Sequence, residues 1–159
     1  LRFLGHPAVM TRTGDEAIYD AAAATLREKK VSDLKNRTKL ANETAGGLLI
    51  SIHQNCYPDR KPSGAQVLYA ASTGSDTLGI QMHDNLVTYL DPQNRRVAAP
   101  ISEKIYLMHA VQCPAVLVEC GFLSNREEAA RLQQEDYQKT LATVIAAGYL
   151  RWMAGEDRK

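Results

Sequence analysis

The sequence lacks the features that mark membrane proteins, disulfide-rich proteins and nucleic-acid-binding proteins. No apolar run approaches the roughly 20 residues that a membrane-spanning helix requires. A formal net charge of only +1 gives no electrostatic support for binding nucleic acid or an acidic membrane surface. Three cysteines form neither a disulfide framework nor a Cys-x-x-Cys pair. With 45% hydrophobic and 23% charged residues in a chain of 159, a single globular domain is the simplest interpretation.

Two apolar segments predict buried strands that each lead to an ionisable side chain. Residues 48–52 are apolar except for one serine, and His53 follows them. Residues 115–118 are apolar, and Glu119 follows them. Because ligands gather outside the carboxyl ends of strands in α/β sheets, His53 and Glu119 are the first pair expected to share a site. The alternative is that both side chains simply lie where strands meet water.

Helical and turn patterns between these strands predict an α/β domain. A helix capped by Ser32 leads through Gly46 and Gly47 into the first strand, as in a parallel α/β unit. The other expected elements are strands at 8–12 and 65–69, helix-favouring sequence at 17–24, a helix capped by Gly74-Ser75-Asp76, an apolar run of ambiguous type at 105–108, a short helix after Ser124 or Asn125, and a last helix capped by Asp136.

Polar residues near the strand ends are candidates for binding a substrate. Asn55 begins a loop, residues 55–64, that follows the His53 strand, and loops in such places tend to carry binding function. Arg95 and Arg96 lie in a later loop, where a guanidinium suits a carboxylate but also suits plain exposure to solvent. We predict Asn55 and Arg95 as substrate-binding residues.

A histidine and a carboxylate at one sheet edge suit metal-assisted hydrolysis. Histidine is the commonest metal ligand, and zinc is the usual metal of a hydrolase site built on it. A nearby carboxylate can move protons, and burial is expected to raise the pKa of Glu119. Cys56 follows His53 at ligand spacing, but no second compact pair accompanies it. A catalytic zinc takes three protein ligands, so spacing alone leaves the site incomplete.

Several segments resemble the zinc-dependent N-acetylmuramoyl-L-alanine amidases (amidase type 3), in the same order along nearly the whole chain. They are Val9-Met10-Thr11-Arg12, Asp33-Leu34-Lys35-Asn36-Arg37 with Ala41-Asn42, Ser51-Ile52-His53-Gln54-Asn55, Gly64-Ala65-Gln66 and residues 114–125. The long segment between Arg12 and Asp33, together with residues 119–125, is most similar to the spore-cortex, germination-specific branch.

This resemblance implies one amidase catalytic domain over residues 1–159, an α/β three-layer sandwich with a mostly parallel central sheet flanked by helices. It implies a peptidoglycan hydrolase that cleaves the amide between the lactyl group of N-acetylmuramic acid and L-alanine of the stem peptide. His53 corresponds to the last Zn²⁺ ligand and Glu119 to the catalytic carboxylate. The zinc would polarise the amide carbonyl and activate water, and Glu119 would shuttle the proton. An extracellular location in the cell wall or spore cortex, and an activator or regulatory protein as partner, follow from the same resemblance.

The N-terminal part of the family pattern is missing from this sequence. The family begins with a strand ending in an Asp-Pro-Gly-His-Gly type motif that supplies the first zinc ligand, and a Glu on the following helix supplies the second. Residues 1–6 match only the tail of that helix and the turn after it. We therefore expect a domain that lacks the family's first strand and most of its first helix, either because residues precede Leu1 or because the domain is truly truncated. The 159-residue chain alone is expected to bind zinc weakly and to have little amidase activity.

Two other interpretations compete with the amidase. One is a metal-poor peptidoglycan-binding or regulatory domain that keeps the groove without the chemistry. The other is an unrelated α/β domain, but the shared order of several motifs argues against coincidence.

Overall fold

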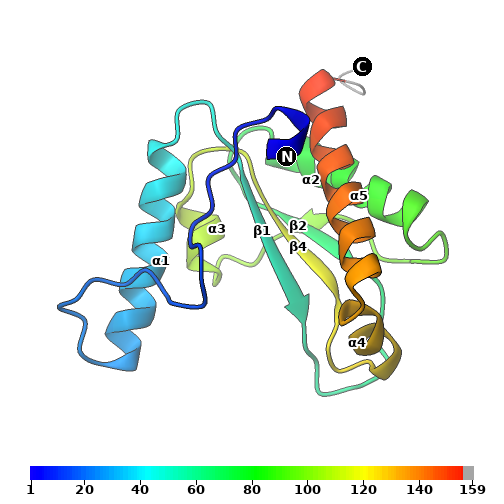
Figure 1. The fold of residues 1–159 in the computed structure, drawn as a ribbon, viewed down its shortest axis with the longest axis horizontal. Helices are drawn as coiled ribbons and strands as arrows, with labels where there is room; N and C mark the ends of the chain where they lie inside the picture. Colours follow the sequence, from blue (N-terminus) through cyan, green and yellow to red (C-terminus); the bar gives the residue numbers. More distant parts are fainter. Residues whose placement is uncertain (156–159) are drawn as a thin grey trace.

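The centre of the molecule is a four-stranded sheet in the computed structural model, which describes residues 1–155 (Figure 1). The strands lie in the order β1 (Leu49–Asn55), β4 (Ala115–Phe122), β2 (Gln66–Tyr69) and β3 (Ala99–Pro100). β1 pairs with β4 and β2 with β3 in parallel, whereas β2 and β4 are antiparallel. The sheet is therefore mostly parallel, as predicted. The sequence analysis missed β3, which has only two residues.

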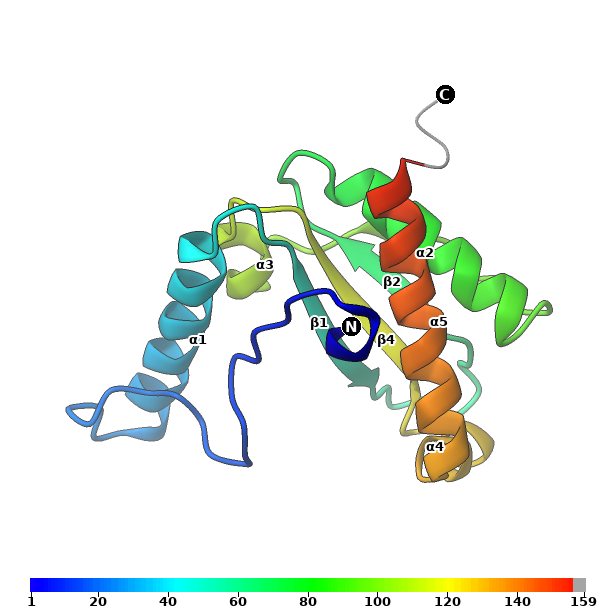
Figure 2. The same ribbon diagram turned by 45° about the horizontal axis from the view of Figure 1, so that its top comes forward.

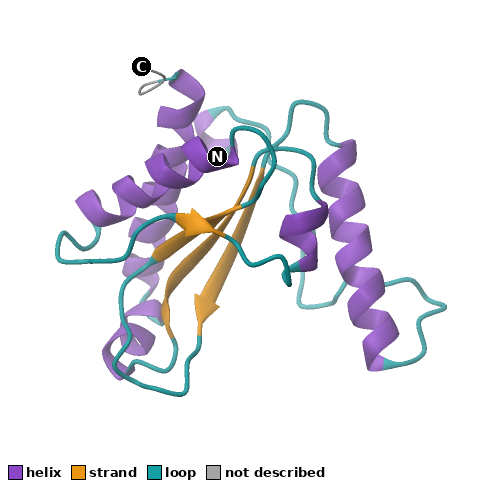
Figure 3. Cartoon of the chain, turned by 180° about the vertical axis from the view of Figure 1, so that it is seen from behind, coloured by secondary structure: helices purple, strands orange, loops and turns teal. Residues whose placement is uncertain are grey.

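Helices cover both faces of this sheet, which confirms the predicted three-layer α/β architecture (Figure 3). α3 (Tyr106–Ala110) and α1 (Leu26–Glu43) lie on one side, and α2 (Ser75–Tyr89) and α5 (Glu135–Ala154) lie on the other. A fifth helix, α4 (Arg126–Leu132), follows β4 and contacts both β4 and α5. Within residues 1–155, no helix is long and apolar enough to cross a membrane.

β4 divides the hydrophobic core because its side chains alternate between the two faces. Val116 and Val118 are fully buried in the larger cluster, together with Leu78 of α2 and Val144 of α5. On the opposite face, Leu117 belongs to a smaller cluster under α3 and α1. Seven of the eight residues of β4 are buried, and Glu119 is the exception. The strand that leads to the candidate carboxylate is thus fixed on both faces.

The N-terminal segment differs from its predicted secondary structure. Residues 8–12 form no strand, and residues 17–24 form no helix. The side chains of Val9 and Met10 are 63% and 66% exposed, because no neighbouring strand or helix layer covers them. The short helical turn η1 (Arg2–Leu4) instead lies beside α5 (Figure 2). Just after this turn, the His6 ring meets the Tyr149 ring of α5 edge-on, and the His6 Nδ1 is 3.1 Å from the Tyr149 phenolic oxygen.

Two predicted helix starts were also wrong, although the helices themselves are present. α1 begins earlier than Ser32, since Thr25 forms a capping box with Glu28 that supplies a complete start signal. The Ser32 hydroxyl instead donates to the carboxylate of Asp20 at 2.7 Å. The last helix is capped by Gln134, and Asp136 lies in its first turn. Asn125 caps α4 as predicted, with its side chain accepting from two backbone amides.

Candidate functional site

The register of the sheet places His53 directly beside Glu119. The two residues are Cα partners in the parallel pairing of β1 with β4. On the other side of Glu119, the antiparallel pairing makes Gln66 its partner. Glu119 is two residues after Leu117, so its side chain lies on the α1 and α3 face of the sheet. His53, Glu119 and Gln66 therefore form a row across three strands on one face.

Glu119 and Gln66 are the half-buried members of this row, and His53 is exposed. The Glu119 Oε2 atom is buried and has no hydrogen-bond partner within the described structure. Burial raises the pKa of the Glu119 carboxyl above its ordinary value, and the nearby His53 offsets part of that rise. A carboxyl with a raised pKa and an unoccupied acceptor oxygen is suited to taking up and releasing a proton.

The two residues predicted to bind substrate lie in different places. Asn55 is the last residue of β1, and its carbonyl oxygen accepts the Leu123 amide at 2.7 Å, so it joins the ends of β1 and β4. Arg95 is exposed in the loop between α2 and β3. The structure thus brings Asn55 to the same sheet edge as His53 and Glu119, while Arg95 stays on the surface of a neighbouring loop.

Arg96, which received no role from the sequence, is the arginine connected to the row. Its Nη1 donates to Gln66 Oε1 at 3.1 Å, and its Nε donates to the Ser63 carbonyl at 2.7 Å. The guanidinium carbon also lies 4.4 Å from the centre of the Phe122 ring, a cation–π contact. The sequence offered no means of choosing between the adjacent arginines, since the choice depends on β2 lying next to β4.

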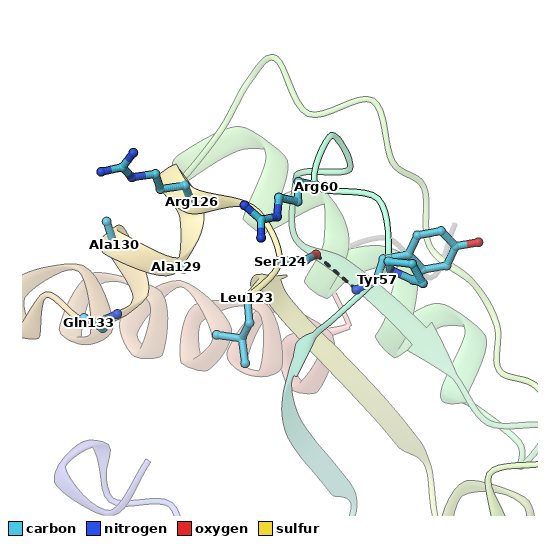
Figure 4. A pocket seen from close by; sticks show the side chains of 9 residues that line it. Tyr57, Arg60, Leu123, Ser124, Arg126, Ala129, Ala130 and Gln133 are labelled. Atoms are coloured by element: carbon cyan, nitrogen blue, oxygen red, sulfur yellow. Dashed lines mark hydrogen bonds between the residues drawn. The ribbon is translucent and has the colours of Figure 1, made fainter.

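A cavity of about 740 Å³ lies at the same end of the sheet but does not include His53 or Glu119 (Figure 4). Tyr57 and Arg60 line it from the loop after β1, and Leu123 and Ser124 line it from the loop after β4. The Tyr57 amide donates to the Ser124 hydroxyl at 3.1 Å, the contact drawn in Figure 4. This cavity therefore adjoins the loops of the candidate site without forming its chemical centre.

The residues present fit part of a zinc site. His53 offers an imidazole, and Glu119 beside it offers a buried oxygen that lacks a partner. Among residues 1–155, however, no group of three or more His, Cys, Asp or Glu side chains is placed to hold a metal ion. Cys56 is exposed, and Cys120 is buried in the larger core cluster, on the face opposite Glu119. Burial also raises the pKa of the Cys120 thiol to about 11, which disfavours the thiolate that binds metals.

Comparisons with known proteins agree with this architecture. The chain is 36% identical to the germination-specific N-acetylmuramoyl-L-alanine amidase of Bacillus subtilis over 93% of its own length and 62% of that protein. It is 28% identical to the amidase LytC of Bacillus subtilis over 72% of its own length and 23% of that protein. The chain thus spans less than two thirds of the length of either relative.

Solved structures show the same relationship. The CwlD amidase of Clostridioides difficile, solved in complex with the GerS lipoprotein, superposes with a TM-score of 0.86 at 32% identity, covering 92% of this chain and 75% of that one. An N-acetylmuramoyl-L-alanine amidase of Clostridium difficile 630 superposes with a TM-score of 0.70 at 29% identity, covering 79% and 67% of the two chains. The family model described as N-acetylmuramoyl-L-alanine amidase matches residues 1–151, so the chain belongs to the N-acetylmuramoyl-L-alanine amidase family.

Proposed function

We propose that this chain carries part of the catalytic centre of a peptidoglycan amidase, which cleaves the amide between the lactyl group of N-acetylmuramic acid and L-alanine of the stem peptide. The observation that carries the proposal is the adjacency of His53 and Glu119 in the register of β1 and β4. Membership of the amidase family supports the reaction class.

Glu119 is the proposed proton carrier. Its Oε2 is buried, lacks a hydrogen-bond partner within the described structure and belongs to a carboxyl whose pKa is raised by burial. In the charged form, Glu119 takes a proton from the attacking water. In the neutral form, it gives that proton to the departing amine. Burial of β4 on both faces holds this carboxylate in place during the exchange.

His53 is the proposed zinc ligand of the chain. Its exposed imidazole, beside a carboxylate at the end of a strand, has the position of a ligand that remains accessible to a metal ion. When bound, zinc supplies a Lewis acid for the amide carbonyl and for water. Because residues 1–155 hold no set of three ligands, we expect the isolated chain to bind zinc weakly.

Substrate contacts, location and partner complete the proposal. Asn55, at the joined ends of β1 and β4, and Arg95, in the neighbouring loop, are the proposed contacts with peptidoglycan. A peptidoglycan substrate places the protein at the cell envelope, in the cell wall or the spore cortex. The CwlD amidase was solved in complex with the GerS lipoprotein. By analogy, we propose that a regulatory protein also binds the present chain.

The test measures amide cleavage in a purified muropeptide in the presence of excess zinc, by a form of the protein with a complete zinc-ligand set, because residues 1–155 hold no set of three ligands. We expect Glu119→Gln to lower kcat by about 100-fold or more, since it removes general acid–base catalysis. Glu103→Gln, in the exposed loop before α3, is the matched control and should retain wild-type activity. His53→Ala should weaken zinc binding, measured by calorimetry. Near-wild-type cleavage by Glu119→Gln would refute the assignment of Glu119.

A second candidate function is supported by the incomplete ligand set within residues 1–155. A metal-poor domain of this family would bind peptidoglycan without cleaving it. Sedimentation of the protein with purified peptidoglycan, with no amide cleavage even when a complete zinc-ligand set is supplied, would favour this function. Release of stem peptides with a free N-terminal L-alanine would favour the amidase if that release depends on Glu119.

A further inference from the structure

Glu128 is a buried carboxylate that the proposed chemistry does not use. It lies in α4, nine residues after Glu119, and it is only 5% exposed. Its Oε1 accepts the Gly64 amide at 2.9 Å, and its Oε2 accepts the Phe122 amide at 2.8 Å. Arg131, which is more exposed, approaches Oε1 at 3.4 Å. Both carboxylate oxygens are thus occupied by backbone amides from two segments that are far apart in the sequence.

These two segments are the ones that frame the candidate site. Gly64 ends the loop after β1, the strand that carries His53, and Phe122 ends β4, the strand that carries Glu119. A charged acceptor makes both hydrogen bonds stronger than ordinary amide–carbonyl bonds. Glu128 therefore ties the loop that follows one candidate residue to the strand that carries the other.

The local sequence is adapted to this contact. Gly121 has a φ of +153°, and a Cβ atom there would lie 3.3 Å from Glu128 Oε2. A side chain at Gly121 would therefore crowd the Glu128 carboxylate at the end of β4. Phe122, the next residue, packs its ring against the Arg96 guanidinium. Arg96 in turn donates a hydrogen bond to the side chain of Gln66, the strand partner of Glu119. Displacing Phe122 would therefore disturb the Gln66 end of the row.

We propose that Glu128 is a positioning residue of the candidate site, whose carboxylate fixes the loop after β1 and the end of β4 so that Glu119 faces His53. The inference rests on the proposed function for its catalytic consequence, but the hydrogen bonds and the position of His53 can be tested without any activity. Glu128 touches neither of the two candidate residues and acts through Phe122 and Gly64.

The experiment compares Glu128→Ala and Glu128→Gln with Glu127→Gln, the exposed neighbour in the same helix. Hydrogen exchange of the Gly64 and Phe122 amides should become about 10- to 100-fold faster in Glu128→Ala, because both lose their acceptor. Glu128→Gln keeps one acceptor oxygen, so at most one of these amides should remain protected. The imidazole NMR signals of His53 should shift in both Glu128 variants, and Glu127→Gln should match the wild type.

The catalytic consequence is measured as a separation of kcat from KM, in the form of the protein that has a complete zinc-ligand set. We expect Glu128→Ala to lower kcat by about 100-fold with KM nearly unchanged, since a small displacement of a catalytic group has that effect. If Glu128→Ala does not fold, the same measurements are made on Glu128→Gln. Unchanged exchange at both amides would overturn the inference. Faster exchange with unchanged His53 signals would also overturn it, because Glu128 would then be only structural. Absence of amidase activity from a form of the protein with a complete zinc-ligand set would refute the proposed function, while exchange and the His53 signals would still decide the role of Glu128.

Discussion

Replacing Asp33 with Asn tests how the N-terminal segment is attached to the domain. The Asp33 carboxylate accepts two hydrogen bonds from Arg37, at 2.7 Å and 3.0 Å, and a third from the Ile18 amide at 2.8 Å. Arg37 also donates to the Thr11 hydroxyl at 2.8 Å. Because residues 8–24 form no regular secondary structure, these contacts are a main attachment of the segment to α1. Asn keeps the shape of the side chain but loses its charge and one acceptor site.

The expected loss of stability can be estimated from burial. The side chains of Arg37 and Asp33 are 19% and 14% exposed, so water screens the pair less than it screens a surface pair. A hydrogen bond to a charged group contributes about 1.5–3 kcal/mol when buried, and an exposed pair contributes about 0.2–1 kcal/mol. We therefore expect Asp33→Asn to lower the free energy of unfolding by about 1–2 kcal/mol. For a domain of this size, that corresponds to a fall in Tm of about 2–8 °C.

The same helix supplies a matched control. Lys39 and Glu43 form another i,i+4 pair in α1, but at 3.9 Å and with side chains 70% and 65% exposed. Glu43→Gln should change the free energy of unfolding by less than about 0.5 kcal/mol. Urea titration of both variants gives the comparison. Equal midpoints for Asp33→Asn and Glu43→Gln would refute the argument that burial gives the Asp33 pair its strength.

The Asp33 prediction also has a dependence on pH. Hydrogen bonds from Arg37 hold the pKa of Asp33 below its ordinary value of 3.8 in the folded chain. A carboxyl with a lowered folded pKa stabilises the protein above its unfolded pKa, and this stabilisation is lost as pH falls toward the folded pKa. The advantage of the wild type over Asp33→Asn should therefore be full near neutral pH and should shrink below pH 3.8. A difference that stays constant through that range would contradict the explanation.

Two further predictions concern the core and the candidate site. Leu78→Ala should lower the free energy of unfolding by about 2–5 kcal/mol, because Leu78 is fully buried between α2 and the sheet; a urea-midpoint change as small as that of the exposed control Ile80→Ala would contradict it. Glu119→Gln should raise stability near neutral pH in the absence of zinc. The folded pKa of Glu119 is raised above its ordinary 4.5, so its charged form destabilises the fold, and the advantage of the amide should vanish as pH falls below 4.5. The urea midpoints of the wild type and Glu119→Gln should converge at low pH. A difference between them that widens there would contradict a raised pKa of Glu119 in the folded chain.

The elements that sequence analysis predicted well are those with strong local patterns. β1 and β4 are apolar runs, and α2 has an apolar stripe behind Gly74, so local sequence already defines them. Residues 8–12 have a comparable β-branched and apolar character but form no strand. A strand needs a partner as well as propensity, and the sheet order within residues 1–155 places none beside this segment. The same dependence on partners explains why the two-residue β3 was missed.

The candidate site divides in the same way between local pattern and long-range contact. His53 and Glu119 were paired from sequence because each follows an apolar strand and parallel strands bring their carboxyl ends together. Gln66, Arg96 and Glu128 could not be placed in this way. Gln66 reaches Glu119 only because β2 runs antiparallel to β4, and Glu128 reaches Gly64 across 64 residues of sequence. The strand pattern therefore predicts which groups meet, whereas the side chains that hold them together depend on the way the completed sheet brings its loops into contact.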